Sequence, residues 1–215
     1  MSTGDRASGE RLNAMLAETG LAPLDPKQTS RFEEFLSLFV RWNARINLTS
    51  VRDEDSILFR HFVESIACAR ALPEGISTLL DFGSGGGFPG VPIALIRPEI
   101  TVTLAESQGK KAAFLQEAVR VLGISAKVHA GRAELLNIEF DCVTLRAVDR
   151  MAAAVEAGAG LVARGGWLAL MTTRSDLAGL QVAAGAAFSW AHLVSLPGGD
   201  ERVLALGQRA VGFPA

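Results

Sequence analysis

The sequence predicts an α/β protein with a doubly wound, mostly parallel sheet. Before Pro73 the apolar residues recur at the spacing of a helix face, and after it short apolar runs alternate with helical stretches. Strands that alternate with helices pair in parallel through right-handed crossovers. The last two apolar runs flank a Gly-Gly-Asp turn, which is typical of a hairpin. We therefore expect a seven-stranded sheet with an antiparallel strand at one edge and a helical extension at the N-terminus.

The helical extension should cover residues 1–72. Ser30 followed by Glu33 matches a capping box, the pattern that begins many helices. One face of this helix would carry Phe32, Phe35, Leu36 and Phe39. The helix should end near residue 43, and further helices are expected at about 8–19 and 53–71.

Residues 73–215 should form the sheet domain and pack with the extension as one compact unit. The runs expected to be strands are 76–82, 102–105, 126–130, 142–145, 167–171, 192–196 and 202–206. Residues 110–122 have a helical pattern, and Gly123 stands where a left-handed cap would end that helix.

Composition excludes several other classes of protein. The chain has 215 residues, of which 49% are hydrophobic, so it can bury one substantial core. A formal net charge of −2 gives no overall attraction to nucleic acid, so a polyanionic partner needs a local basic patch. Cys68 and Cys142 stand alone in apolar stretches, which indicates reduced, buried thiols and no metal site. Because there is no secretory signal pattern and no long apolar run, we expect a cytoplasmic protein that does not associate with membranes.

The most informative segment runs from Asp81 to Gly90, at the end of the first expected strand. Ligands of open α/β sheets bind at this edge, and glycines allow a ligand to lie against bare backbone. Gly85, Gly87 and Gly90 match the Rossmann dinucleotide fingerprint, and Glu106 ends the next strand, where an acid can accept hydrogen bonds from a ribose. A nicotinamide- or flavin-dependent oxidoreductase is therefore one reading, and a structural turn is another.

Two details favour a different cofactor. Asp81 stands beside the loop, where its carboxylate would repel a diphosphate but suit a cationic sulfonium and amino group. Glycine also crowds the loop, at Gly83 and at residues 85–87, which suits contacts with a nucleoside and a methionine backbone. The sequence thus favours the class I fold of S-adenosylmethionine-dependent methyltransferases, a Rossmann-like sheet.

Three further residues are candidates for the same site. Ala133 and Glu134 follow the third strand and could wall an adenine. Arg146 closes the fourth strand and could hold the cofactor carboxylate or a substrate phosphate. A buried structural ion pair explains Arg146 equally well.

An ordered set of motifs resembles the bacterial 16S rRNA (guanine-N7)-methyltransferases, also called RsmG or glucose-inhibited division protein B (GidB). The resemblance covers about Phe32 to Thr172. It rests on Trp42-Asn43, Ile46-Asn47-Leu48-Thr49, Arg60-His61-Phe62 with Ser65, the loop from Asp81 to Pro92, Glu106-Ser107, Lys110-Lys111, Phe114-Leu115, Arg132-Ala133-Glu134 and Arg146-Ala147.

The resemblance implies a cofactor and a substrate. S-adenosylmethionine, which leaves as S-adenosylhomocysteine (SAH), would be held by Gly83, Phe88, Ala133, Glu134 and Arg146. The target would be one guanine of 16S rRNA near the decoding region, in naked rRNA or in the 30S particle. The family usually carries Lys-Gly after the fifth strand, whereas this chain has Met171-Thr172-Thr173, so a contact by that lysine is not expected here.

This target suits a site without a general base. Guanine N7 has a free lone pair and no proton to lose, so methyl transfer requires only that the base be held in line with the donor. A nucleic-acid-binding module without catalytic activity, retaining the same fold, is a further alternative.

Contacts with RNA are expected from basic residues around the cleft. Arg41 and Arg45 share a helix face, and the rim could be extended by Arg52, Arg60, His61, Lys110 and Lys111. Paired basic residues on a helix are commonly only a solvated face, and His61 could equally be structural. No protein partner is expected, and the chain should be a monomer.

Overall fold

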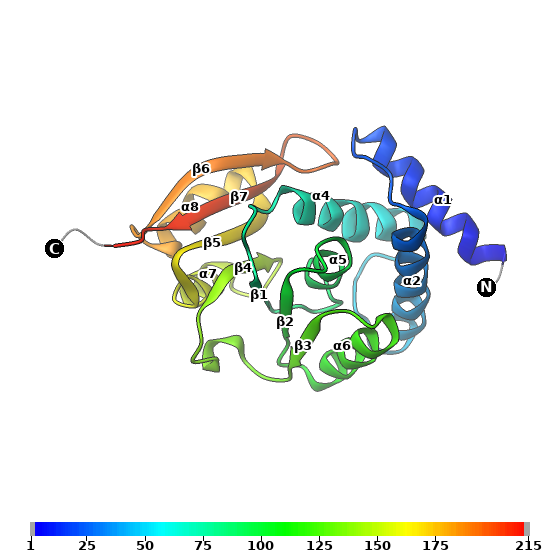
Figure 1. The fold of residues 1–215 in the computed structure, drawn as a ribbon, viewed down its shortest axis with the longest axis horizontal. Coiled ribbons are helices and arrows are strands. Elements are labelled where there is room, and N and C mark those ends of the chain that lie inside the picture. Colours follow the sequence, from blue (N-terminus) through cyan, green and yellow to red (C-terminus); the bar gives the residue numbers. More distant parts are fainter. Residues whose placement is uncertain (1–2, 213–215) are drawn as a thin grey trace.

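The computed structural model describes residues 3–212, with side chains from residue 8 onward, and has an open seven-stranded sheet at its centre (Figure 1). The strands lie in the order β3-β2-β1-β4-β5-β7-β6. They are β1 Thr78–Phe82, β2 Thr101–Ala105, β3 Ala126–His129, β4 Phe140–Arg146, β5 Val162–Thr173, β6 Phe188–Ser195 and β7 Arg202–Arg209. The strand order reverses beside β1, which has β2 on one side and β4 on the other.

The sheet is mixed in the way that the sequence predicts. Strands β1 to β5 pair in parallel, whereas β7 pairs antiparallel with both β5 and β6. The β6–β7 hairpin forms one edge of the sheet, and its antiparallel member, β7, lies one strand inside that edge. The other edge is β3.

Helices cover both faces of the sheet, which is what a doubly wound sheet requires. The α-helices are α1 Thr3–Glu18, α2 Pro26–Ile46, α3 Glu54–Ile57, α4 Glu64–Ala71, α5 Gly90–Ile96, α6 Gly109–Leu122, α7 Met151–Ala159 and α8 Arg174–Ala184. Two short elements complete them, the π-helix η1 Leu58–Val63 and the 3-10 turn η2 Ala133–Leu135.

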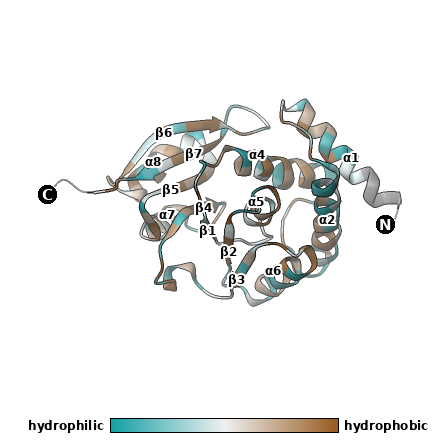
Figure 2. Cartoon of the chain, viewed as in Figure 1, coloured by the Kyte–Doolittle hydropathy of each residue, from teal (hydrophilic) through white to brown (hydrophobic). Residues whose placement is uncertain are grey.

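Two apolar cores follow from the alternation of side chains along the strands. Leu79 of β1 belongs to the cluster that includes side chains of α1 to α6 on one face, and its neighbour Leu80 belongs to the cluster that includes side chains of α7 and α8 on the other. The first core includes side chains of α1, α2 and α4, so the N-terminal helices and the sheet share one continuous apolar cluster. Figure 2 shows apolar residues concentrated on the central strands and α5.

The start of α2 differs from the prediction. The capping box expected at Ser30 and Glu33 is wrong, because the helix begins at Pro26 with Asp25 as its cap. Asp25 Oδ1 accepts from the Gln28 amide at 2.7 Å, and Gln28 Oε1 accepts from the Asp25 amide at 3.3 Å. Proline at the first helical position, preceded by an extended aspartate, starts the helix one turn earlier than the serine would.

The helix expected over residues 53–71 is present but is not regular. It starts at an Asp53 cap, passes through the π-helical segment η1 and continues as α4. Arg60 and His61 both lie in η1, where the wider turn changes the spacing of side chains along the helix. This segment faces the carboxyl ends of the central strands.

Candidate functional site

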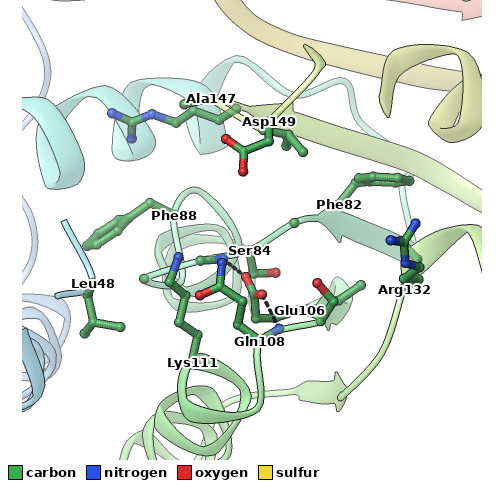
Figure 3. Close-up of a pocket in the computed structure, with 18 of the residues that line it drawn as sticks. Leu48, Phe82, Ser84, Phe88, Glu106, Gln108, Lys111, Arg132, Ala147 and Asp149 are labelled. Carbon is green, nitrogen blue, oxygen red and sulfur yellow. Dashed lines mark hydrogen bonds between the residues drawn. The ribbon is translucent and has the colours of Figure 1, made fainter. Parts of the chain in front are cut away.

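A cavity of about 410 Å³ lies at the carboxyl ends of β1, β2 and β4, where the strand order reverses (Figure 3). The cavity is lined by the glycine loop (residues 83–90), the segment after β2, the turn at η2, the loop after β4, and side chains from α2, η1 and the loop that follows α2. Of the residues expected to bind the cofactor, Gly83, Gly85, Phe88, Glu106, Ala133, Glu134 and Arg146 line this cavity.

The glycine loop presents backbone to the cavity. Gly83 and Gly85 have φ values of 73° and 54°, in the left-handed region that favours glycine. Gly87 also has a positive φ, of 86°. Packing further excludes a side chain at two positions, because a Cβ atom would lie 2.8 Å from the Phe39 ring at Gly86 and 2.8 Å from Val91 at Gly87. The glycines of this loop are therefore explained by backbone conformation and by packing.

Glu106 is fixed by the backbone on both sides. Its Oε2 accepts from the Gly85 amide at 2.9 Å, and its Oε1 accepts from the Gln108 amide at 2.7 Å (Figure 3). The side chain is 6% exposed. Each carboxylate oxygen can accept a second hydrogen bond, so the group has the capacity to hold two hydroxyls of a sugar in the cavity.

Asp81 lies beneath the glycine loop and does not line the cavity. Its Oδ2 accepts from the Gly90 amide and its Oδ1 from the Thr144 hydroxyl, each at 3.1 Å. Burial raises the pKa of Asp81 to about 6. The expectation that this carboxylate faces a cationic ligand therefore does not fit its position; it instead joins the start of α5 to β4.

Arg146 belongs to an arginine cluster, which we define as Arg60, Arg146 and Arg202 around the buried carboxylate of Glu64. Arg146 and Arg202 reach Glu64 Oε2 at 3.1 and 3.0 Å, and Arg60 reaches Oε1 at 3.4 Å. Burial raises the pKa of Glu64, and the three guanidinium groups oppose that shift. The interpretation of Arg146 as part of a buried ion pair is confirmed. Because Arg146 also lines the cavity, its contact with a ligand stays a prediction.

His61 forms the wall between the arginine cluster and the glycine loop. Its ring stacks on Phe88, with centroids 5.0 Å apart. Nδ1 lies 3.5 Å from the Arg146 nitrogen that also contacts Glu64, and Nε2 lies 2.8 Å from Thr49 Oγ1. Burial and the neighbouring arginines lower the pKa of His61 to about 3, so the ring is neutral at physiological pH.

Most of the other basic residues expected to contact RNA lie outside the cavity lining, and among them is Arg52, which is exposed. Arg41, Arg45 and Lys110 are exposed, and Arg60 has half of its side chain exposed at the cluster. Lys111, rather than its neighbour Lys110, lines the cavity.

Sequence reasoning missed the loop after β4. Val148, Asp149 and Arg150 line the cavity, and so do Gln108 and Thr49. This loop follows Arg146 at the carboxyl end of a central strand, where ligands of such sheets bind, and its position could have indicated that it lines the site.

Other kinds of site are not apparent within residues 3–212. In that part of the chain no group of three or more His, Cys, Asp or Glu residues could hold a metal ion. Cys68 and Cys142 are buried free thiols, and burial raises the pKa of Cys68 to about 12. Over the same residues, none of the helices has the length and apolar character needed to cross a bilayer.

The strand order, the antiparallel β7, the glycine loop and the acid that ends β2 define the class I methyltransferase fold. Solved structures share it. An O-methyltransferase from Bacillus cereus in complex with SAH superposes with a TM-score of 0.63 at 14% identity, over 92% of this chain and 97% of that one. Magnesium protoporphyrin IX methyltransferase from Synechocystis, with bound S-adenosylmethionine, has a TM-score of 0.56 at 19% identity, over 87% and 98% of the two chains.

The chain belongs to the family of rRNA small subunit methyltransferase G (GidB), whose model matches residues 28–196. Proteins named ribosomal RNA small subunit methyltransferase G are similar to it. The one from Roseiflexus castenholzii is 44% identical over 66% of this chain and 64% of its own length. The one from Xanthomonas oryzae is 38% identical over 87% of this chain and 90% of its own length. The match thus spans less than two thirds of the Roseiflexus relative and most of the Xanthomonas one.

Proposed function

We propose that this protein transfers a methyl group from S-adenosylmethionine to N7 of one guanine of 16S rRNA, near the decoding region, in the cytoplasm. Membership of the family supports the transfer of a methyl group to small-subunit rRNA. The main support for this cofactor is the geometry of Glu106. Backbone amides align its two oxygens at the edge of a cavity that is lined by glycine backbone. The choice of guanine, and of its N7 atom, goes beyond what family membership supports and is our own proposal.

The residues around the cavity fit S-adenosylmethionine. Glu106 would accept hydrogen bonds from the ribose hydroxyls, and the buried Ala133 with Glu134 would border the adenine. Gly83 and Gly85 would lie along the methionine part with their backbone. Arg146, at the β4 end, would face its carboxylate, and Phe88 would close that side. The bound cofactor supplies a methyl group attached to a positively charged sulfur.

The chain itself would hold the guanine and the cofactor and orient them toward each other, because N7 of guanine needs no base to remove a proton. His61 supports this reading. Burial and the neighbouring arginines keep its ring neutral at physiological pH, with Thr49 beside one nitrogen and Arg146 beside the other, so His61 serves as a wall of the cavity and not as a proton acceptor. Asp81 would act on the cofactor site indirectly, by holding the amide of Gly90, where the glycine loop continues into α5.

Purified protein incubated with unmodified 30S subunits and methyl-labelled S-adenosylmethionine tests the proposal. Mass spectrometry of digested 16S rRNA should find N7-methylguanosine at one position, and naked 16S rRNA run in parallel identifies which form is the substrate. Labelled rRNA without N7-methylguanosine would refute the assigned atom, and unlabelled rRNA would refute the reaction.

The alternative of a nicotinamide-dependent oxidoreductase predicts a different ligand. A ligand that binds only the folded state raises the melting temperature. We expect SAH to raise it and NAD to leave it unchanged. The alternative of a non-catalytic RNA-binding module predicts that rRNA modification does not change when Glu106 is replaced by alanine.

A further inference from the structure

Asp149 is an acid of the cavity that the proposed cofactor does not account for. It lies in the loop after β4, lines the cavity, and points its carboxylate into it from the side opposite Gln108 and Lys111 (Figure 3). Within residues 3–212 this carboxylate makes no hydrogen bond or ion pair, whereas Glu106 in the same cavity accepts two backbone amides. Asp149 is exposed at the cavity, so its carboxylate is solvated and keeps its full capacity to accept hydrogen bonds from a ligand.

The loop that carries Asp149 is held in a defined shape. Ala147 and Arg150, on either side of it, have φ values of 48° and 52°, a conformation that few residues other than glycine adopt. Val148 packs against the glycine loop, since a Cβ atom on Gly83 would lie 3.1 Å from Val148 Cγ2. The loop is therefore tied to the backbone that borders the cofactor site.

The position of the loop in the fold decides what it can face. The acid after β2 and the turn after β3 hold the nucleoside part of the cofactor in the proposed function, so its reactive end points toward β1 and β4. The loop after β4 lies at that end, next to Arg146. A group bound beside this loop would lie where the methyl acceptor must be.

Guanine has the hydrogen-bonding pattern that a carboxylate requires. Its N1–H and N2 amino group are adjacent donors on the edge away from N7, and an ionised carboxylate offers two acceptor oxygens to such a pair. Adenine presents an acceptor, N1, at the same place, which a carboxylate would repel. A free carboxylate would also repel RNA phosphates, so the base is the part of an RNA that suits this position.

We propose that Asp149 determines the specificity for guanine by accepting hydrogen bonds from its N1–H and N2 amino group while N7 faces the methyl donor. This inference rests on the proposed function and adds to it the side chain that recognises guanine. Asp149 is a specificity-determining residue and takes no part in bond making.

The test compares two substrates and two proteins. 30S subunits are reconstituted with guanosine or with inosine at the methylated nucleotide; inosine keeps N7, O6 and N1–H but lacks the N2 amino group. We expect the wild-type protein to methylate the inosine substrate about tenfold more slowly, the loss of one hydrogen bond to a charged acceptor. Asp149→Ala should methylate guanosine at least tenfold more slowly and lose the difference between the two bases.

A matched control and a second measurement separate the alternatives. Glu156→Ala removes an exposed acid from α7, outside the cavity, and should behave as the wild type does. The affinity for SAH, measured by calorimetry, should be the same in Asp149→Ala and wild type. A large loss of SAH affinity would overturn the inference, because Asp149 would then bind the cofactor's amino group.

An Asp149→Ala protein that still prefers guanosine to inosine would overturn the inference while leaving the proposed function in place. A wild-type protein that methylates neither substrate would instead refute the proposed function itself. The melting temperature of Asp149→Ala, expected to equal that of Glu156→Ala, confirms that the variant is folded.

Discussion

The glycine loop and the arginine cluster meet at the same cavity, which the cluster reaches through Arg146, but they are assembled over very different lengths of chain. Gly85 and Glu106 are 21 residues apart, and their contact joins a backbone amide to a carboxylate. Arg202 and Glu64 are 138 residues apart, and their contact joins two side chains. We call the glycine loop with Glu106 the first wall of the cavity and the arginine cluster the second wall. The first wall depends on local backbone geometry, and the second depends on the whole fold bringing charged side chains together.

This difference has an energetic consequence. The glycine loop faces the cavity with hydrogen-bonding groups that a ligand can use, so changes there should mainly affect binding. The arginine cluster buries one carboxylate among three cations, so removing the carboxylate leaves buried charge without compensation. The largest effect on folding should therefore come from the cluster and the largest effect on the cofactor from the loop.

Replacing Glu64 by alanine should have the largest effect of all. Arg146 and Arg202 would remain close together without an anion, and such a loss costs about 3–5 kcal/mol of unfolding free energy. Urea denaturation measures it. Glu74→Ala, which removes an exposed acid from the turn after α4, should cost less than about 0.5 kcal/mol. Equal stabilities of these two variants would show that the cluster does not support the fold.

Replacing Glu106 by alanine should weaken SAH binding by roughly 100-fold, because two hydrogen bonds to a charged acceptor are lost at about 1.5 kcal/mol or more each. Calorimetric titration with SAH measures the change, with Glu74→Ala as the control. Unchanged affinity in Glu106→Ala would place the ribose elsewhere and would remove the functional distinction between the two walls.

The pH dependence of stability should reveal the cluster through His61. The unfolded ring has an ordinary pKa of 6.5 and the folded ring a pKa of about 3, so the unfolded state takes up a proton first as the pH falls. Stability is therefore lost between about pH 6.5 and 3. From pH 7 to pH 5 the wild type should lose about 2 kcal/mol more than His61→Gln does.

Denaturant unfolding at the two pH values measures this difference. Asp81 acts in the opposite direction, since its raised folded pKa of about 6 stabilises the folded state as the pH falls, but it is present in both proteins and cancels. Identical losses in wild type and His61→Gln would mean that the ring is not held neutral by its surroundings.

The smallest effect is expected outside both walls. Arg41 and Arg45 are exposed on α2, and contacts of such side chains with phosphates depend on salt. The double alanine variant should weaken binding to 30S subunits a few-fold and reduce the salt slope of log affinity by up to about two. An unchanged salt slope would identify these arginines as a solvated face only.

The two walls also differ in how far the sequence predicts them. The loop and the acid on the next strand follow from short motifs, because the edge of a parallel sheet brings consecutive strand ends together. The sequence allows a buried ion pair for Arg146 but does not identify Glu64 as its partner. The pairing with Arg202 could not be predicted, since Arg202 lies in a hairpin whose place in the sheet is set by long-range pairing. The pattern also does not separate α7 from β5, because alanine and glycine dominate residues 151–166.

Asp81 illustrates a limit of motif reasoning. Its place beside the glycines suggests a ligand contact, but a residue at a strand end can turn either toward the cavity or under the loop. Side-chain direction at that position depends on Gly90 and Thr144, which lie on α5 and on β4. The motif therefore predicts that an acidic residue stands at this position, but it does not predict which groups the carboxylate contacts.

A crystal structure of the protein with SAH tests the central claim most directly. The ribose hydroxyls should lie within hydrogen-bonding distance of both oxygens of Glu106, the adenine beside Ala133, and the homocysteine along Gly83 and Gly85 toward Arg146. SAH bound at another place, or bound here with its sugar turned away from Glu106, would contradict the account.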